Sequence, residues 1–339
     1  MKDKGTWVTE IWGHMPDGRA VHRVTLTGGG LTAHVLTYGA VLQDLRLAGH
    51  DAPLVLGFPE FAPYLTDSPY FGATVGRFAN RIRDGHLELD GQSYQLDTND
   101  GGRHTLHGGA DGLATAIWRI DEVARDHVTL KAVLPDGHMG FPGTLKCFVT
   151  FALKDSGTLD IQMRAEADKT TLCSLAHHSY FTLDDAEAVS QHQLQIAAEG
   201  YTPVDDTLIP TGEIAPVAGT RFDFREQAQL RQAHPVDHNF CLSTARQPLR
   251  PVARLQSLAS RVRMDCLTTE PGLQVYDGAG IALDATGLRG QKMGACAGVA
   301  MEPQVWPDAH HHKDFPQAVL RPGETYHQHT QFVFSKGQA

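Results

Sequence analysis

The chain has 339 residues, of which 41% are hydrophobic and 20% are charged, and its formal net charge is −10. This composition predicts an ordinary globular protein with a large core, and the acidic balance excludes nucleic acid or an anionic membrane as the main partner. The five cysteines form no CxxC pair, and no stretch resembles a signal peptide or a membrane span, so we expect a cytoplasmic protein with reduced thiols.

Apolar and polar residues alternate along much of the chain, a pattern typical of β-strands with one buried face. The first clear example is the segment 87–96, where Asp90-Gly91 divides two short alternating runs and predicts a hairpin. The same alternation predicts further strands at 128–134, 145–153, 159–167 and 326–334. Helical patterns are few, and we expect single turns only, within 58–65 and 225–233.

The order of these elements limits the possible architectures. The chain contains no long amphipathic helix, no alternation of strands with helices and no internal repeat. We therefore predict an all-β fold in which residues 1–339 form one large antiparallel β-sandwich domain. A β-propeller is the alternative, but the repeated blade pattern that it requires is missing.

Two segments in the first third of the chain carry groups that could bind a polar ligand. In the segment 74–83, Asn80 and Arg81 offer donors for hydroxyl or carboxylate groups, although a solvated basic turn explains the segment equally well. His104 and His107 are spaced as two metal ligands, but the third and fourth ligands of a usual zinc site are not evident. The glycines that follow His107 indicate instead a close approach to the backbone.

The segment 175–183 is the densest run of hydrogen-bonding side chains. On a strand, His177 and His178 point to opposite faces, so only one of them is expected to reach a given pocket. Histidine titrates near neutrality and can donate or accept a proton, which makes this segment a candidate for acid–base chemistry. The alternative is a core histidine that is bonded to the backbone.

Polar groups within apolar strands recur in the last third of the chain. Asp237 and Gln274 are isolated groups of this kind, and Glu302 lies between Val299 and Trp306. Loss of hydration raises the pKa of such a carboxyl group unless partners compensate, and a satisfied structural acid is the alternative. Farther on, we expect a solvated loop at 309–313, because adjacent histidines do not all converge on one ion.

Together these segments resemble the aldose 1-epimerase (galactose mutarotase) family. Six motifs follow the order of the family's own, and although each is weak alone, the ordered set is specific. They are Asn80-Arg81-Ile82, Leu106-His107-Gly108-Gly109, His178-Ser179-Tyr180-Phe181, Asp237-His238-Asn239-Phe240, Pro271-Gly272-Leu273-Gln274 and Glu302-Pro303-Gln304-Val305-Trp306-Pro307-Asp308.

The resemblance implies a large β-sandwich that binds a free monosaccharide on its concave face and interconverts its α and β anomers without a metal or cofactor. By matching positions, Glu302 resembles the general base and His178 the general acid. The remaining matches resemble sugar-hydroxyl contacts, and these are Asn80, Arg81, His107, Asp237 and Gln274. We expect Glu302 to stay ionised at neutral pH, because a nearby Arg81 lowers its pKa.

The chain departs from the family pattern at His177, Thr182-Leu183, Asp277 and the loop His310-His311-His312. We expect these changes to reshape the rim of the pocket, so the preferred sugar stays open. Two other functions are considered, an epimerase for a phosphorylated hexose and a non-catalytic sugar-binding or sugar-sensing protein. The acidic surplus disfavours the first, and the presence of both Glu302 and His178 disfavours the second. A monomer or a homodimer is expected.

Overall fold

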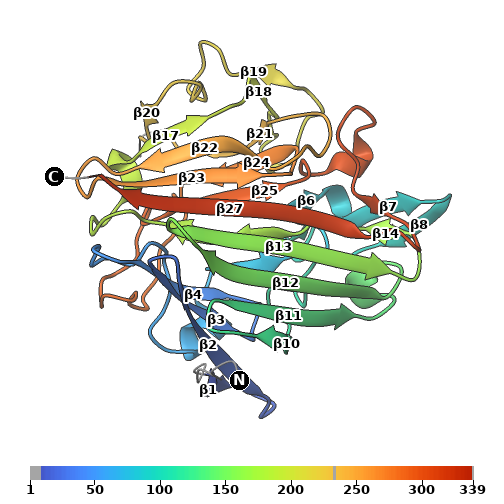
Figure 1. The fold of residues 1–339 in the computed structure, drawn as a ribbon. Helices are drawn as coiled ribbons and strands as arrows, with labels where there is room; N and C mark the ends of the chain where they lie inside the picture. The colour runs from blue at the N-terminus through green and yellow to red at the C-terminus, as the bar shows by residue number, and fades with distance from the viewer. Residues whose placement is uncertain (1–8, 232–233, 338–339) are drawn as a thin grey trace.

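The computed structural model describes residues 9–231 and 234–337, and a long antiparallel sheet dominates it (Figure 1). This sheet has nine strands, and each pairs with its neighbours in antiparallel register. In spatial order the strands are β10 (Arg119–Val123), β11 (His127–Leu134), β12 (Leu145–Lys154), β13 (Thr158–Ala167), β27 (Tyr326–Lys336), β23 (Val262–Thr268), β22 (Arg250–Gln256), β17 (Gln193–Ile196) and β20 (Ala228–Gln229).

Two further sheets complete the layers. One of them has six strands, of which β18 and β19 lie at the top of Figure 1. Its strands in spatial order are β16 (Tyr180–Phe181), β25 (Val299–Gln304), β24 (Gly272–Tyr276), β21 (Asp237–Cys241), β18 (Gly200–Tyr201) and β19 (Ala215–Pro216). A four-stranded sheet is built from β1 (Thr9–His14), β2 (Ala20–Gly28), β3 (Leu31–Leu36) and β4 (Leu42–Leu47).

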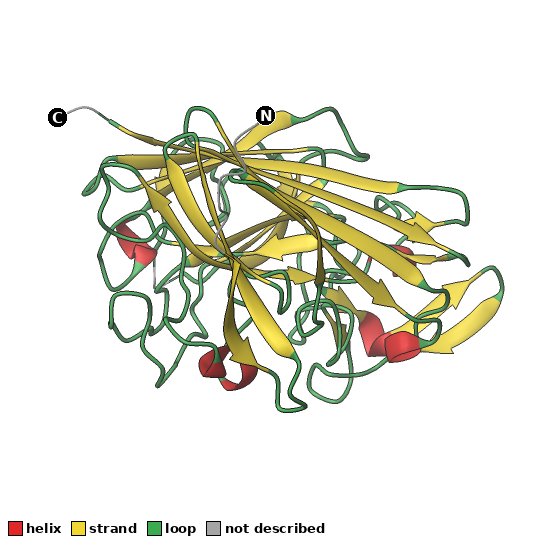
Figure 2. Cartoon of the chain, turned by 60° about the horizontal axis from the view of Figure 1, so that its bottom comes forward, coloured by secondary structure: helices red, strands yellow, loops and turns green. Residues whose placement is uncertain are grey.

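Short ladders and turns surround these sheets. The paired strands are β14 (Thr171–Leu172) with β26 (Val319–Leu320), β15 (Ala176–His178) with β5 (Ala73–Val75), β6 (Arg81–Ile82) with β9 (Thr105–Leu106), and β7 (His86–Leu89) with β8 (Gln92–Gln95). The helical segments are α1 (Ala62–Thr66) and the 3₁₀ turns η1 (Arg83–Gly85), η2 (His138–Gly140), η3 (Val189–Gln191) and η4 (Ala309–His311). The long strands occupy one side of the molecule, and most loops and helical turns lie on the other (Figure 2). None of the helices described is long and apolar enough to cross a membrane.

The alternating sequence pattern explains the long strands. Along β13, Leu159, Ile161 and Met163 are at most 1% exposed, whereas Gln162 and Arg164 are only partly buried. Asp160 departs from this pattern because it is also buried. It is satisfied by Lys154 Nζ at 2.8 Å, His329 Nε2 at 2.6 Å and the amide of Gln331 at 2.6 Å. These contacts lower the pKa of Asp160 despite its burial, so the carboxylate stays charged on the sheet surface.

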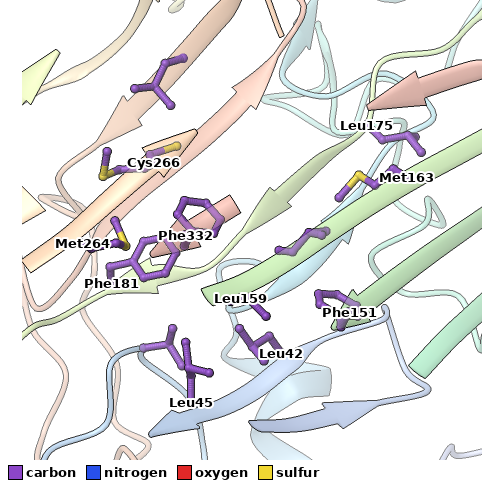
Figure 3. Close-up of a cluster of buried hydrophobic side chains, with 14 of the residues drawn as sticks. Leu42, Leu45, Phe151, Leu159, Met163, Leu175, Phe181, Met264, Cys266 and Phe332 are labelled. Atoms are coloured by element: carbon purple, nitrogen blue, oxygen red, sulfur yellow. The ribbon is translucent and has the colours of Figure 1, made fainter. Parts of the chain in front are cut away.

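The core lies between the sheets and draws on residues from most of the chain. Phe181 and Phe332 pack with ring centroids 4.7 Å apart within the cluster drawn in Figure 3. Successive side chains of strand β25 point alternately into this core and toward the opposite face of the sheet. Val299 and Met301 join the core cluster, and the side chain of Glu302 therefore points to the opposite face of the six-stranded sheet.

The predicted all-β sandwich is confirmed, as are the hairpin at 87–96 and the strands at 128–134, 145–153, 159–167 and 326–334. The helical turn expected within 58–65 is present as the start of α1. The one expected within 225–233 is wrong for residues 225–231, and 232–233 lie outside the described residues. Residues 228–229 pair instead with β17 at the sheet edge. The single domain over 1–339 stays a prediction.

Replacing Phe332 with Ala should lower the free energy of unfolding by about 3–5 kcal/mol, because the cavity left in this core cannot collapse fully. Urea titration followed by circular dichroism measures the loss. Leu258→Ala is the matched control, since Leu258 is 59% exposed and little apolar burial is lost there. Equal losses in the two variants would contradict the assignment of Phe332 to the main core.

Candidate active site

A cavity of about 280 Å³ opens on the face of the six-stranded sheet that is turned away from the core. Strands β25, β21 and β24 supply part of its wall, and β15, β16, β6, β9 and nearby loops supply the remainder. The lining residues are Pro69, Tyr70, Asn80, Arg81, Leu106, His107, His178, Tyr180, Leu208, Asp237, Tyr276 and Glu302. Every site residue expected from the sequence, except Gln274, lies in this lining.

The strand register places the acidic groups of the cavity. Asn239, Gln274 and Glu302 are direct neighbours across β21, β24 and β25, so their side chains share one face. Asp237 is two residues from Asn239 and therefore points to the same side. The amide Nε2 of Gln274 donates to Asp237 Oδ1 at 2.6 Å. Gln274 thus orients the carboxylate of Asp237, and Asp237 is the residue of this pair that lines the cavity.

His178 reaches the cavity because β15 alternates as expected. His177 points into the core, where its ring lies 5.6 Å from that of Phe151 and its Nε2 is 2.7 Å from Ser179 Oγ. His178 points the other way, and its Nε2 lies 3.5 Å from Glu302 Oε1. Both partners of this contact are at most 4% exposed. The prediction that only one of the two histidines reaches the pocket is confirmed.

A hydrogen-bonded turn holds Asn80, Arg81 and His107 together. The backbone N–H of Asn80 donates to His107 Nδ1 at 3.1 Å, which leaves the ring proton of a neutral His107 on Nε2. The Asn80 side-chain oxygen accepts the backbone N–H of Arg81 at 2.8 Å. Arg81 in turn donates its Nε–H to Asp100 Oδ2 at 2.7 Å, so its guanidinium group is fixed at the cavity wall.

The backbone of the cavity is unusual. Tyr70, Asn80, His107 and Leu208 all have positive φ, between 53° and 66°, although none is glycine. Side chains other than glycine seldom adopt this conformation, and when they do they cluster at functional sites. The Tyr70 ring packs against His107 at 4.7 Å and against His178 at 5.6 Å. Tyr70 therefore limits the orientations that both imidazole rings can adopt.

Burial controls the electrostatics of the site. It raises the pKa of Glu302 well above its ordinary value, and the nearby carboxylate of Asp237 raises it further, whereas Arg81 lowers it. Arg81 therefore does not offset the effect of burial on this pKa, and the ionisation of Glu302 at neutral pH stays a prediction. Burial also lowers the pKa of His178 to about 4 and that of His107 well below 6.5. Burial thus shifts both Glu302 and His178 toward their neutral forms.

Two atoms at the centre of the site have no hydrogen-bond partner among the described residues. They are Glu302 Oε2 and His178 Nδ1, and both are buried. An orphaned buried polar atom costs free energy, and a polar ligand in the cavity would relieve that cost. Glu302, His178 and His107 also offer three ligand atoms within 4.8 Å of one another, a group that suits a metal ion as well as a sugar.

The expected effect of the family departures on the pocket rim is wrong at three positions. His177, Thr182 and Asp277 are buried and do not line the cavity. Asp277 braces a turn instead, because its Oδ2 accepts the backbone N–H of Val236 at 2.9 Å. His104 also stays outside the cavity, where its Nδ1 accepts the N–H of Asp84.

Sequence analysis did not assign a role to the residues that brace the site. Tyr70 and Tyr276 contribute aromatic walls, and Asp100 holds Arg81. Tyr180 stood within a recognised motif, and a polar-tipped aromatic ring beside an acid–base histidine was the signal available there. No such signal marks Asp100, because its contact with Arg81 depends on how two loops fold.

Comparison with known proteins identifies the family of this chain. The family model described as aldose 1-epimerase matches residues 22–333. The chain belongs to the aldose 1-epimerase family. A rat galactose mutarotase is 39% identical over 96% of this chain and 97% of its own length, and an aldose 1-epimerase of Escherichia coli K12 is 32% identical over 94% and 96%.

Solved structures of the aldose 1-epimerase family share the fold. An aldose epimerase homologue from C. elegans has a TM-score of 0.88 and 32% identity, and it covers 94% of this chain and 100% of its own. A galactose 1-epimerase from Lactobacillus acidophilus has a TM-score of 0.84 and 28% identity, with coverage of 98% and 100%. The family resemblance and the enzyme class, an isomerase, are confirmed, and a non-catalytic function is not favoured.

The lowered pKa of His178 predicts a pH dependence of stability. The unfolded chain binds a proton at this residue below about pH 6.5 and the folded chain does not until about pH 4, so stability is lost as the pH falls through this range. His178→Asn should reduce the slope of unfolding free energy against pH by up to about 1.4 kcal/mol per pH unit.

Urea unfolding at several pH values within this range measures the slope. His327→Asn is the matched control, since His327 is exposed. A slope that stays the same in the His178 variant would show that burial does not suppress protonation of this ring.

Proposed function

We propose that the protein interconverts the α and β anomers of a free aldose, with galactose as the first sugar to test. The observation that carries this proposal is the buried contact of 3.5 Å between His178 Nε2 and Glu302 Oε1. This contact lies in the wall of the cavity that we propose binds the monosaccharide. Mutarotation needs an acid and a base that act on two oxygens of the same carbon atom, the anomeric hydroxyl and the ring oxygen. The two catalytic groups must therefore lie close together, as these do.

In the proposed reaction, the Glu302 carboxylate removes the proton of the anomeric hydroxyl while His178 donates a proton from Nε2 to the ring oxygen. The bond between the anomeric carbon and the ring oxygen breaks, and the electron pair of the O–H bond forms the aldehyde. Rotation about the bond to the neighbouring carbon exposes the other face. Closure reverses both proton transfers, with Glu302 as the acid and His178 as the base.

The active pair holds one proton between its two members. Burial favours the form in which Glu302 carries it and His178 is neutral. The reaction starts from the other form, with a carboxylate and an imidazolium, which has the same net charge and differs only in the position of the proton. A bound sugar favours this form, because its hydroxyl groups replace water as hydrogen-bond partners of the charged groups.

The remaining polar groups are proposed to hold the sugar. Arg81 and His107 present N–H donors to ring-oxygen or hydroxyl groups, and Asn80 supports both. Asp237 offers an acceptor, because only its Oδ1 is engaged by Gln274. Such convergent donors and acceptors orient a substrate so that proton transfer needs little reorganisation.

A phosphorylated hexose suits this cavity less well. Arg81 is already paired with Asp100, and the carboxylate of Asp237 disfavours an anionic group in the cavity. A free monosaccharide is therefore the proposed substrate. The cytoplasmic location and the choice between a monomer and a homodimer stay predictions.

Glu302→Gln and His178→Asn should each lower kcat for mutarotation by roughly 10²–10⁴-fold, since each removes one proton-transfer group. Polarimetry or NMR exchange with galactose and glucose measures the rate, and the pair His14→Asn and His327→Asn, both exposed, provides the control. Variants that bind galactose normally and keep the wild-type rate would refute the assigned roles. A wild-type protein that accelerates no aldose would refute the function itself.

The rate of mutarotation should depend on pH as a bell. Below about pH 4, His178 becomes protonated while Glu302 is also protonated, so the pair holds two protons and Glu302 can no longer act as a base. Above the raised pKa of Glu302, the pair loses its only proton and no acid remains. We expect kcat/KM to fall on both sides of this window. A rate that does not fall on either side of this window would contradict one-proton catalysis.

A further inference from the structure

The segment that follows β25 brings three side chains together outside the sugar cavity. Asp308 is fully buried with a φ of 54°, and this left-handed residue starts the turn η4. Its backbone N–H donates to the carbonyl oxygen of Arg81 at 2.9 Å. The turn therefore begins directly beside a wall of the proposed active site.

Adjacent histidines are expected to point apart, but the turn η4 brings two of their rings close together. The rings of His310 and His311 lie with their centroids 3.8 Å apart, and His311 Nδ1 is 2.6 Å from Asp308 Oδ1. One candidate ligand atom from each of these three residues lies within 4.8 Å of the other two. The solvated loop expected at 309–313 is therefore wrong for Ala309, which is buried, and only partly right for the histidines, of which His310 and His312 are partly buried.

The hydrogen bonds of His310 prepare one of its nitrogens for a metal. Its Nε2–H donates to the carbonyl oxygen of His86 at 3.0 Å, so the lone pair of the neutral ring is on Nδ1. This Nδ1 is buried and has no hydrogen-bond partner among the described residues. Histidine ligands of metals commonly have this arrangement, with one ring nitrogen donating to a backbone carbonyl and the other binding the ion.

The carboxylate of Asp308 has a similar unused atom. No hydrogen bond within the described chain reaches its Oδ2, although the side chain is fully buried. His312 Nε2 lies 3.5 Å from this oxygen and also lacks a hydrogen-bond partner. Three orphaned atoms, one each from Asp308, His310 and His312, thus gather at one turn.

We propose that Asp308, His310 and His311 bind a divalent transition-metal ion of the Zn²⁺ type, with His312 as the fourth ligand. Imidazole and carboxylate groups are the ligands that Zn²⁺ takes at about 2.0–2.2 Å. Such an ion would satisfy the orphaned atoms and draw the turn together. The site lies outside the sugar cavity and shares no residue with the proposed acid–base pair.

One neighbouring cation opposes the ion. Arg83 Nε is 3.6 Å from Asp308 Oδ2, and its positive charge competes for the carboxylate. The side chain of Arg83 is 40% exposed, so it can turn into solvent when an ion binds. Its Nη2 also donates to the carbonyl oxygen of Pro210, at 3.0 Å, two residues from Leu208 in the cavity lining.

These contacts define what the ion would do. By fixing Asp308, it would stabilise the backbone next to Arg81, and by displacing Arg83 it would release one tie on the loop that carries Leu208. We therefore assign the ion a structural role. The proposed metal site is tested by measuring metal binding and not by measuring mutarotation. The result of that test therefore does not depend on whether the proposed function is correct.

The test is Zn²⁺ binding to full-length protein prepared without a polyhistidine tag and treated with a chelator. Isothermal titration is performed in the His178→Asn background, because this change removes the other group of three candidate ligands, at Glu302. We expect one ion per chain. The double variant His310→Ala/His311→Ala should weaken binding at least roughly tenfold, the minimum expected when ligands are lost.

Two comparisons guard against a folding defect. Arg83→Met should strengthen Zn²⁺ binding, because it removes the competing charge, and a misfolded variant would not gain affinity. The double variant His14→Ala/His327→Ala changes two exposed histidines and should leave binding as it was. Zn²⁺ should also raise the thermal unfolding midpoint of the parent but not of the variant without His310 and His311.

Binding that is unchanged in the His310/His311 variant, or that is weakened equally in the His14/His327 control, would overturn the proposal. So would an Arg83→Met variant that binds Zn²⁺ more weakly than its parent. Either result with the histidine variants would mean that the ion occupies scattered surface histidines. Weaker binding by Arg83→Met would mean that Arg83 is part of the site and not its competitor.

Discussion

The burial of Glu302 is the constraint on which the arrangement of the rest of the site depends. A carboxyl group removed from water needs either a proton or a close partner of opposite charge. The chain places His178 Nε2 3.5 Å from it, on a strand that is itself buried. A single proton shared by the two groups keeps the folded protein neutral at this point, and the same proton is the one that the proposed reaction moves. Stability and chemistry therefore rest on one desolvated contact.

The other residues of the cavity can be understood from this contact. Asp237 lies on the same sheet face and raises the pKa of Glu302, whereas Arg81 lowers it. Pairing with Asp100 occupies the Nε of Arg81 and weakens the influence of its charge on the cavity. The balance of these effects raises the pKa of Glu302, so burial favours its neutral form.

Much of the fold could be predicted because it depends on a local period. Leu159, Ile161 and Met163 mark a strand face whatever their distant partners are, and His177 and His178 diverge for the same reason. The helical turn predicted for residues 225–231 is wrong because Ala228 and Gln229 pair with a strand that is distant in the sequence. Its local pattern contained no information about that pairing.

The bracing of the site could not be predicted for a related reason. Tyr70 packs on two histidine rings from a left-handed backbone position, and Asp100 meets Arg81 across a turn. Both contacts follow from loop conformations that have no sequence period. His310 and His311 converge because they lie on a 3₁₀ turn, which the sequence did not indicate.

The antiparallel register of β24 and β25 limits how this chain can change in length. An inserted residue inside β25 would turn the Glu302 side chain toward the core and present Met301 to the cavity, because neighbouring positions face opposite sides. Insertions and deletions are therefore excluded from β25, because they would move the buried acid out of the cavity.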